Sequence, residues 1–192
     1  MKTIELLNEI NSPEDIKKLS VEQMNILSDE IRKGILNRVN KIGGHLGPDL
    51  GFVEATVALH YVFNSPVDKF VFDVSHQSYP HKMLTGRKAG YIDDTHFKED
   101  SGYTNPEESE HDLFNIGHTS TSVSLATGLA KARDLKDQKH NVIALIGDGS
   151  LGGGEALEAL NFAGSDLKSN LIIIYTTLYI YSNIVFIFLI HC

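Results

Sequence analysis

Apolar residues recur at helical spacing over the first forty or so residues of the chain. After Ser20 the apolar positions return every three or four residues, at Met24, Leu27, Ile31, Ile35 and Val39. Ser20 and Gln23 form the sequence pattern of a capping box, which marks the start of a helix. Gly43 and Gly44 mark its end, because glycine adopts the positive φ that turns a chain out of a helix. The pattern therefore predicts a helical leader over residues 1–44.

Three later segments are apolar at successive positions, which indicates strands buried on both faces of a parallel sheet. They are KFVFDV at 69–74, NVIALI at 141–146 and NLIII at 170–174. Helical patterns at 119–135 and 153–163 separate them. Strands that alternate with helices are typical of an α/β fold, here a doubly wound and mostly parallel sheet.

The rest of the chain divides by composition. Residues 45–174 carry the α/β pattern, but 86–115 are so polar that we expect a surface excursion or lid with no core element. Residues 175–192 form an apolar tail that lacks glycine, alanine, proline and charge. Such a tail has no charged residue to discourage pairing of strand edges, so we expect poor solubility.

Composition narrows the class of protein. An apolar content of 42% with 22% charged residues is that of a globular chain able to bury a core. The net charge of −8 disfavours a nucleic-acid surface, so a bound phosphate must be held by backbone amides or a metal. The single cysteine, Cys192, and an N-terminus without a signal-peptide core favour a cytoplasmic location.

One segment has the length of a membrane span. Residues 171–190 contain no Asp, Glu, Lys or Arg. However, Thr176, Thr177, Ser182 and Asn183 lie within it, and no basic residue follows to fix an orientation. A membrane anchor is therefore the minor alternative.

Polar motifs follow the predicted strands, where ligands of open parallel sheets bind. SHQSYPHK follows the first strand, NIGHTSTS precedes the middle helix, and GDGSLGGG follows the second strand. The glycines of the last motif let the backbone approach an anion, and Asp148 then suits a hard cation such as Mg²⁺. The other interpretation is that Asp148 only caps the following helix.

These motifs carry a resemblance to a known family. GDGSLGGGEALEALN resembles the first half of the diphosphate-binding motif of thiamine-diphosphate enzymes. GGHLGPDLGFVEATVALHYVFNSPVDKFVFDVSHQSYPHKMLTGR and NIGHTSTSVSLATGLA resemble, more narrowly, the 1-deoxy-D-xylulose-5-phosphate synthase family. The similarity runs from about Val21 to Ile174, with the motifs in order.

The resemblance implies roles for particular residues. His45 would face the substrate and assist proton transfer, and His76 would lie against the cofactor. Gly117, His118 and Thr119 would line the cofactor site.

It also implies roles in the turn after the second strand. Asp148 would bind Mg²⁺, and Gly149 and Ser150 would contact the diphosphate of thiamine diphosphate.

The family's reaction condenses pyruvate with glyceraldehyde 3-phosphate to give 1-deoxy-D-xylulose 5-phosphate and CO₂. The product serves the synthesis of isoprenoid precursors, thiamine and pyridoxal. The resemblance further implies a homodimer.

The resemblance stops abruptly after the third predicted strand, at Tyr175–Thr177. The family's spacing places an asparagine, a second Mg²⁺ ligand, at the position of Thr177. A threonine hydroxyl does not reach as far as an amide oxygen, so we expect metal affinity to fall by at least roughly 10 to 100-fold. Without that ligand and the family's later domains, we expect no synthase activity from these residues alone.

Three interpretations remain open. The chain is a fragment of the synthase whose tail is an out-of-frame or mis-predicted reading of the gene, or the N-terminal subunit of a split transketolase-like enzyme. The third interpretation is a noncatalytic protein anchored in a membrane by residues 171–190.

Overall fold

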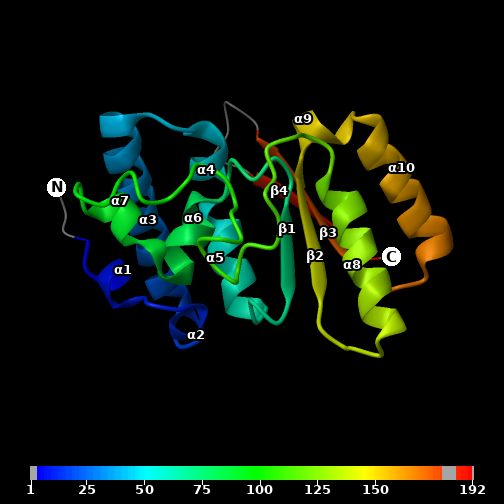
Figure 1. The fold of residues 1–192 in the computed structure, drawn as a ribbon. Helices are drawn as coiled ribbons and strands as arrows, with labels where there is room; N and C mark the ends of the chain where they lie inside the picture. The colour runs from blue at the N-terminus through cyan, green and yellow to red at the C-terminus, as the bar shows by residue number, and fades with distance from the viewer. Residues whose placement is uncertain (1–3, 179–184, 192) are drawn as a thin grey trace. The chain divides into compact units, whose positions relative to one another are not determined.

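A computed structural model describes residues 4–178 and 185–191, which divide into two compact units. Unit 1 comprises Met1–Ser65 and His76–Tyr103, and unit 2 comprises Pro66–Ser75 and Thr104–Cys192. Cys192 and part of the apolar tail lie outside the described residues. Figure 1 shows the course of the chain through both units.

Unit 1 is helical. Its elements are α1 (Leu6–Glu9), α2 (Pro13–Ile16), α3 (Val21–Ile42), α4 (Gly47–Gly51), α5 (Val53–Val62), α6 (Tyr79–Lys82), the kinked turn η1 (Met83–Arg87) and α7 (Ala89–Ile92). The predicted capping box at the start of α3 is confirmed, because Ser20 Oγ accepts from the Gln23 N–H. Gly43 ends the helix at φ 79°, also as predicted. The core forms around Leu27, Ile31 and Ile35 on the buried face of α3.

Unit 2 holds the sheet. Its elements are β1 (Lys69–Phe72), α8 (Ser122–Leu135), β2 (Val142–Gly147), α9 (Asp148–Leu151), α10 (Gly154–Phe162), the π-helical turn η2 (Ala163–Leu167), β3 (Ile172–Leu178) and β4 (Val185–His191). The strand order is β1-β2-β3-β4. The first three strands are parallel, as the apolar runs predict, and β4 pairs antiparallel with β3.

The core of unit 2 lies between the sheet and two helices. Figure 1 shows α8 and α10 together on one face of the sheet. Side chains that point to this face, including Val71, Ala144 and Ile173, pack with Ala126 and Ala156 of the helices. Small residues on the helices let them approach the strands closely. The α/β class with a mostly parallel sheet is thus the observed fold.

One expectation about residues 86–115 is wrong in its first part. Helix α7 lies there, and the side chains of Tyr91 and Phe97 are 0% and 2% exposed. Tyr91 belongs to the core of unit 1, although isolated aromatic residues in a polar stretch show no periodicity. The second part, residues 104–115, contains neither helix nor strand.

The apolar tail forms strands over most of its described length. β3 and β4 pair over seven residues each, from Ile172 opposite His191 to Leu178 opposite Val185. In the parts of the chain that the structure describes, no helix is both long and apolar enough to cross a membrane.

Candidate functional site

The carboxyl end of β1 leads into a tightly bonded corner of unit 2. The buried carboxylate of Asp73 accepts the backbone N–H of Ser120 and that of Ser122, each at 3.0 Å. Val74 and Ser75 follow with φ values of 57° and 67°. A β-branched residue rarely adopts positive φ, and backbone strain of this kind gathers at functional sites. Asp73 therefore fixes the end of the GHTSTS loop, at Ser120 and Ser122, against a strained strand end.

Ser75 extends this corner. Its hydroxyl donates to the carbonyl of Ile116 at 2.8 Å and accepts the N–H of Thr104 at 3.0 Å. Ser75 is 0% exposed. Both sides of the loop that begins at Gly117 are thus held by buried hydrogen bonds.

The loop itself leaves its predicted site residues exposed. Gly117, His118 and Thr119 are all accessible to solvent. His118 Nδ1 lies 3.0 Å from the carbonyl oxygen of Thr119. A carbonyl only accepts, so Nδ1 carries the proton, and in the neutral ring Nε2 is left as an acceptor. The loop offers one imidazole and several backbone groups to a ligand.

The turn after β2 is joined to this loop. Ser120, at φ 71°, donates its hydroxyl to the carbonyl of Ser150 at 2.7 Å. A Cβ on Gly153 would lie 1.9 Å from Ser120 Oγ, so only glycine allows the two segments to approach this closely. The GHTSTS and GDGSLGGG motifs therefore form one structural unit.

Asp148 and Gly149 stand exposed at the tip of the turn, while Ser150 is 8% exposed. Asp148 Oδ1 accepts the Gly149 N–H at 2.8 Å. A Cβ on Gly147 or Gly149 would meet nothing within 4 Å, so there is open space above the backbone. The helix expected from Gly153 is preceded by the short helix α9, which starts at Asp148 itself.

Thr177 lies at the same edge of the sheet. Gly147 of β2 pairs with Thr176 of β3, so the residues that follow, Asp148 and Thr177, occupy neighbouring positions beyond this pair. This register places Thr177 where a second ligand beside Asp148 would come from. Among the described residues, no cluster of three or more His, Cys, Asp or Glu side chains forms a metal site by itself.

Unit 1 brings together the other two predicted site residues. The rings of His45 and His76 have their centroids 5.2 Å apart in an edge-on arrangement. Tyr103 also packs edge-on against His45, with ring centroids 5.3 Å apart and its hydroxyl 3.5 Å from His45 Nε2. Both histidines are half-buried. His45 Nδ1 is buried and has no hydrogen-bond partner within residues 4–178 and 185–191.

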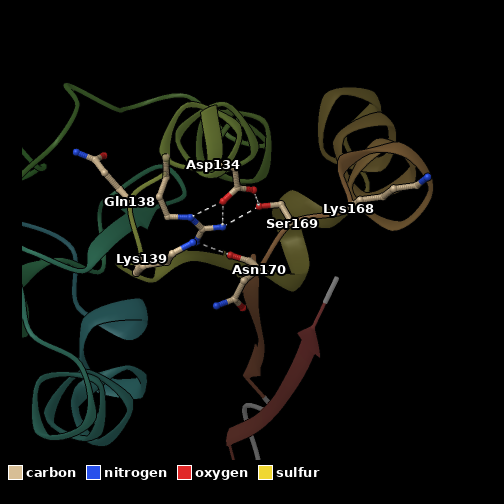
Figure 2. A pocket seen from close by; sticks show the side chains of 7 residues that line it. Asp134, Gln138, Lys139, Lys168, Ser169 and Asn170 are labelled. Atoms are coloured by element: carbon tan, nitrogen blue, oxygen red, sulfur yellow. Dashed lines mark hydrogen bonds and ion pairs between the residues drawn. The ribbon is translucent and has the colours of Figure 1, made fainter. Parts of the chain in front are cut away.

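A second polar region lies at the amino ends of the strands. It is a hollow of about 540 Å³ lined by Arg133, Asp134, Gln138, Lys139, Lys168, Ser169 and Asn170. Figure 2 shows Gln138 and Lys168 pointing in opposite directions, away from Ser169 and Asn170. These polar ends do not converge on a common point, as the groups of a ligand site do.

The Arg133 guanidinium beside this hollow is engaged by the protein. It donates to the carbonyls of His140 at 3.0 Å and Asn170 at 2.8 Å, to Ser169 Oγ, and to Asp134 Oδ1. These hydrogen bonds use four of its five N–H groups, and Nη2 also forms an ion pair with Asp134 Oδ1 at 2.8 Å. Arg133 is 4% exposed, so this region ties α8 to the starts of β2 and β3.

Sequence reasoning missed the residues that support the site. Asp73 lies near the end of the strand predicted at 69–74, but a carboxylate in that place gives no sign that it will be buried. Ser120 lies inside the GHTSTS motif, and only its positive φ and its hydrogen bond to Ser150 reveal its role. Tyr79 and Tyr103 contact His45 from sequence positions 34 and 58 residues away, which no local pattern indicates.

Comparison with known proteins points to one family. Residues 7–180 match the family model described as 1-deoxy-D-xylulose-5-phosphate synthase. The enzyme of that name from Caldanaerobacter subterraneus subsp. tengcongensis is 55% identical over 169 residues, which cover 88% of this chain and 27% of that protein. The one from Pelotomaculum thermopropionicum is 53% identical, over 88% of this chain and 26% of that protein.

A solved structure supports the fold. Transketolase from Leishmania mexicana superposes with a TM-score of 0.66 at 22% identity, over 82% of this chain and 28% of that chain. At this identity the likeness concerns the fold alone. In sequence, the chain spans about a quarter of the length of the curated relatives it matches, 26% to 27%.

Proposed function

The chain belongs to the 1-deoxy-D-xylulose-5-phosphate synthase family, and we propose that it forms the N-terminal part of such an enzyme and holds the diphosphate and Mg²⁺ of thiamine diphosphate. The activity proposed for the whole protein is condensation of pyruvate with glyceraldehyde 3-phosphate to 1-deoxy-D-xylulose 5-phosphate, with release of CO₂. The homodimer and the cytoplasmic location stay predictions.

The observation that carries this proposal is the joined pair of loops at the carboxyl edge of the sheet. Ser120 bonds to Ser150, and Gly153 lets the loops pack closely, so Gly117–Thr119 and Asp148–Gly149 are presented from one braced unit. Exposed backbone amides beside a carboxylate are what a metal-bound diphosphate requires. The cofactor, when bound, supplies the carbanion-stabilising chemistry.

The protein groups then bind and orient. We assign Asp148 to the metal, and the backbone of Gly149 and the hydroxyl of Ser150 to the diphosphate. We assign Gly117, His118 and Thr119 to the wall of the cofactor site.

In unit 1 we assign His76 to contact with the cofactor and His45 to proton transfer at the substrate. The close packing of the two rings supports a shared role. The hydroxyl of Tyr103 lies near His45 Nε2, and Tyr103 is 38% exposed. This nitrogen therefore has a polar neighbour that solvent can reach.

The residues present supply one of the two protein ligands expected for Mg²⁺ at this site. Mg²⁺ takes one or two protein carboxylates and completes its octahedron with phosphate and water oxygens. Asp148 provides one hard oxygen ligand, and Thr177 occupies the neighbouring edge position. We propose that the metal binds here weakly, because Thr177 replaces an amide oxygen.

Calorimetric titration of the 192-residue chain with thiamine diphosphate, with and without Mg²⁺, tests the proposal. We expect saturable binding that requires Mg²⁺, and a loss of about 10-fold or more in affinity in Asp148→Asn. Asp137→Asn is the matched control, because Asp137 is an exposed carboxylate that forms a surface ion pair with Lys139 at 3.6 Å. Equal binding by wild type and Asp148→Asn would contradict the assignment.

A further inference from the structure

The hydroxyl of Tyr79 lies where three segments of unit 1 meet. It accepts the backbone N–H of His45 at 3.3 Å. A Cβ on Gly44 would lie 2.7 Å from this oxygen, and a Cβ on Gly102 would lie 3.5 Å from it. Gly44 has φ 139°, a conformation that other residues rarely adopt. The chain around His45 is thus shaped to the hydroxyl.

Tyr79 is itself held firmly. Its backbone N–H donates to Asp49 Oδ1 at 2.9 Å, and Asp49 is 0% exposed. Its ring packs near the guanidinium of Arg38, at 5.4 Å, and near the ring of Tyr91, at 5.3 Å. Tyr79 is 2% exposed, so the hydroxyl has little freedom to move. Burial, more than any other influence, raises the pKa of Tyr79, so the hydroxyl keeps its proton near neutral pH.

We propose that Tyr79 is a positioning residue for His45: its hydroxyl anchors the His45 backbone and so keeps the imidazole packed against His76 and Tyr103. The hydrogen bond fixes the peptide, and the ring contacts at 5.2 and 5.3 Å then define where the ring nitrogens lie. The inference rests on the proposed function, which gives His45 a role in proton transfer, because that role requires a fixed ring.

Amide hydrogen exchange and ring-to-ring NOEs of the 192-residue chain test this. In Tyr79→Phe the His45 N–H loses its acceptor, so its exchange rate should rise by about 3- to 10-fold. NOEs between His45 and both His76 and Tyr103 should weaken, while exchange in α3 and α5 stays unchanged. A uniform rise across unit 1 would show a general structural role and overturn the proposal.

Tyr91→Phe is the matched control. Tyr91 is also a fully buried tyrosine of unit 1, and its hydroxyl has no hydrogen-bond partner in the described part of the chain. Removing that oxygen should leave the His45 N–H and the ring NOEs as in the wild type. The same local loosening in both variants would contradict a specific role for Tyr79.

Gly44→Ala approaches the contact from the other side and carries the test if Tyr79→Phe is insoluble. The added methyl displaces the hydroxyl, so the His45 N–H should again exchange faster. Ala at φ 139° is strained with or without the Tyr79 oxygen, so part of the effect should persist in the double variant. The part that comes from the clash needs that oxygen, so the effects should be less than additive. Full additivity, or unchanged exchange in Gly44→Ala, would overturn the proposal. The Asp148→Asn titration concerns unit 2, so either idea can fail without the other.

Discussion

The two edges of the sheet in unit 2 use their polar groups differently. At the amino edge, the Arg133 guanidinium donates to the two carbonyls that precede β2 and β3, and to two side chains. At the carboxyl edge, Asp73 and Ser120 bond inside the protein, but Gly117–Thr119, Asp148 and Gly149 face solvent. Charge near a hollow does not by itself make a ligand site, because the polar groups must also be accessible to the ligand.

The largest effect should follow from breaking the amino edge. Arg133→Ala removes the guanidinium and leaves the carbonyls of His140 and Asn170 without this donor, so we expect a loss of about 2–5 kcal/mol in the free energy of unfolding. Urea denaturation of the chain measures this. Arg133→Lys should recover only part of the lost free energy of unfolding, because an ammonium group cannot reproduce the planar array of guanidinium N–H groups.

Lys131→Ala is the surface control for that measurement. Lys131 is exposed on the same helix, so its removal should change stability by less than about 0.5 kcal/mol. Equal effects of Arg133→Ala and Lys131→Ala would remove the structural role that we assign to the amino edge.

A smaller effect should follow from loosening the support of the carboxyl edge. Asp73→Ala leaves the N–H groups of Ser120 and Ser122 without acceptors, which should cost about 1–3 kcal/mol. The loop should also loosen, so thiamine diphosphate should bind more weakly in the same calorimetric titration. Asp73→Asn keeps one acceptor oxygen, so its stability and its cofactor affinity should lie between those of the wild type and those of Asp73→Ala. Unchanged cofactor binding in Asp73→Ala would show that the loop needs no such support.

The smallest effect concerns pH at the amino edge. Burial first, then the charges of Lys69 and Arg133, lowers the pKa of His140 below its usual 6.5. The unfolded chain therefore binds the proton more readily, so His140 reduces stability as pH falls through 6.5 towards its lower folded pKa. In His140→Gln the fall in stability at low pH should be smaller than in the wild type. The difference should be under about 1 kcal/mol, because solvent screens a partly exposed group.

Denaturation midpoints measured at pH 8 and at pH 5.5 check this. The wild type and His140→Gln should differ in stability by a constant amount at high pH, where His140 is neutral in both the folded and the unfolded state. The difference should shift in favour of His140→Gln only at the lower pH. A shift in the opposite direction would contradict the lowered pKa.

The sequence predicted the strands that lead to the site better than it predicted the residues that hold the site's loops in place. Consecutive apolar residues at 69–74, 141–146 and 170–174 identified the parallel strands, because burial on both faces leaves a strong signal. β4 was missed, since the chain after Tyr175 was treated as an aberrant tail, yet its apolar residues pair with β3.

The missing parts depend on long-range contacts. Tyr79 reaches His45, and Asp73 reaches Ser120, across turns whose geometry the local sequence does not encode. The neighbouring positions of Asp148 and Thr177 follow from the strand register, with Gly147 opposite Thr176. Motif spacing indicated the same pair only through the family resemblance.

The most direct measurement of the central claim is the Mg²⁺ affinity of Thr177→Asn in the presence of thiamine diphosphate. If the carboxyl edge is one half of a metal clamp, an amide oxygen beside Asp148 should strengthen Mg²⁺ binding by about 10-fold or more. The gain should vanish in the double variant Thr177→Asn with Asp148→Asn. Unchanged affinity in Thr177→Asn, or a gain that survives loss of the Asp148 carboxylate, would contradict the account.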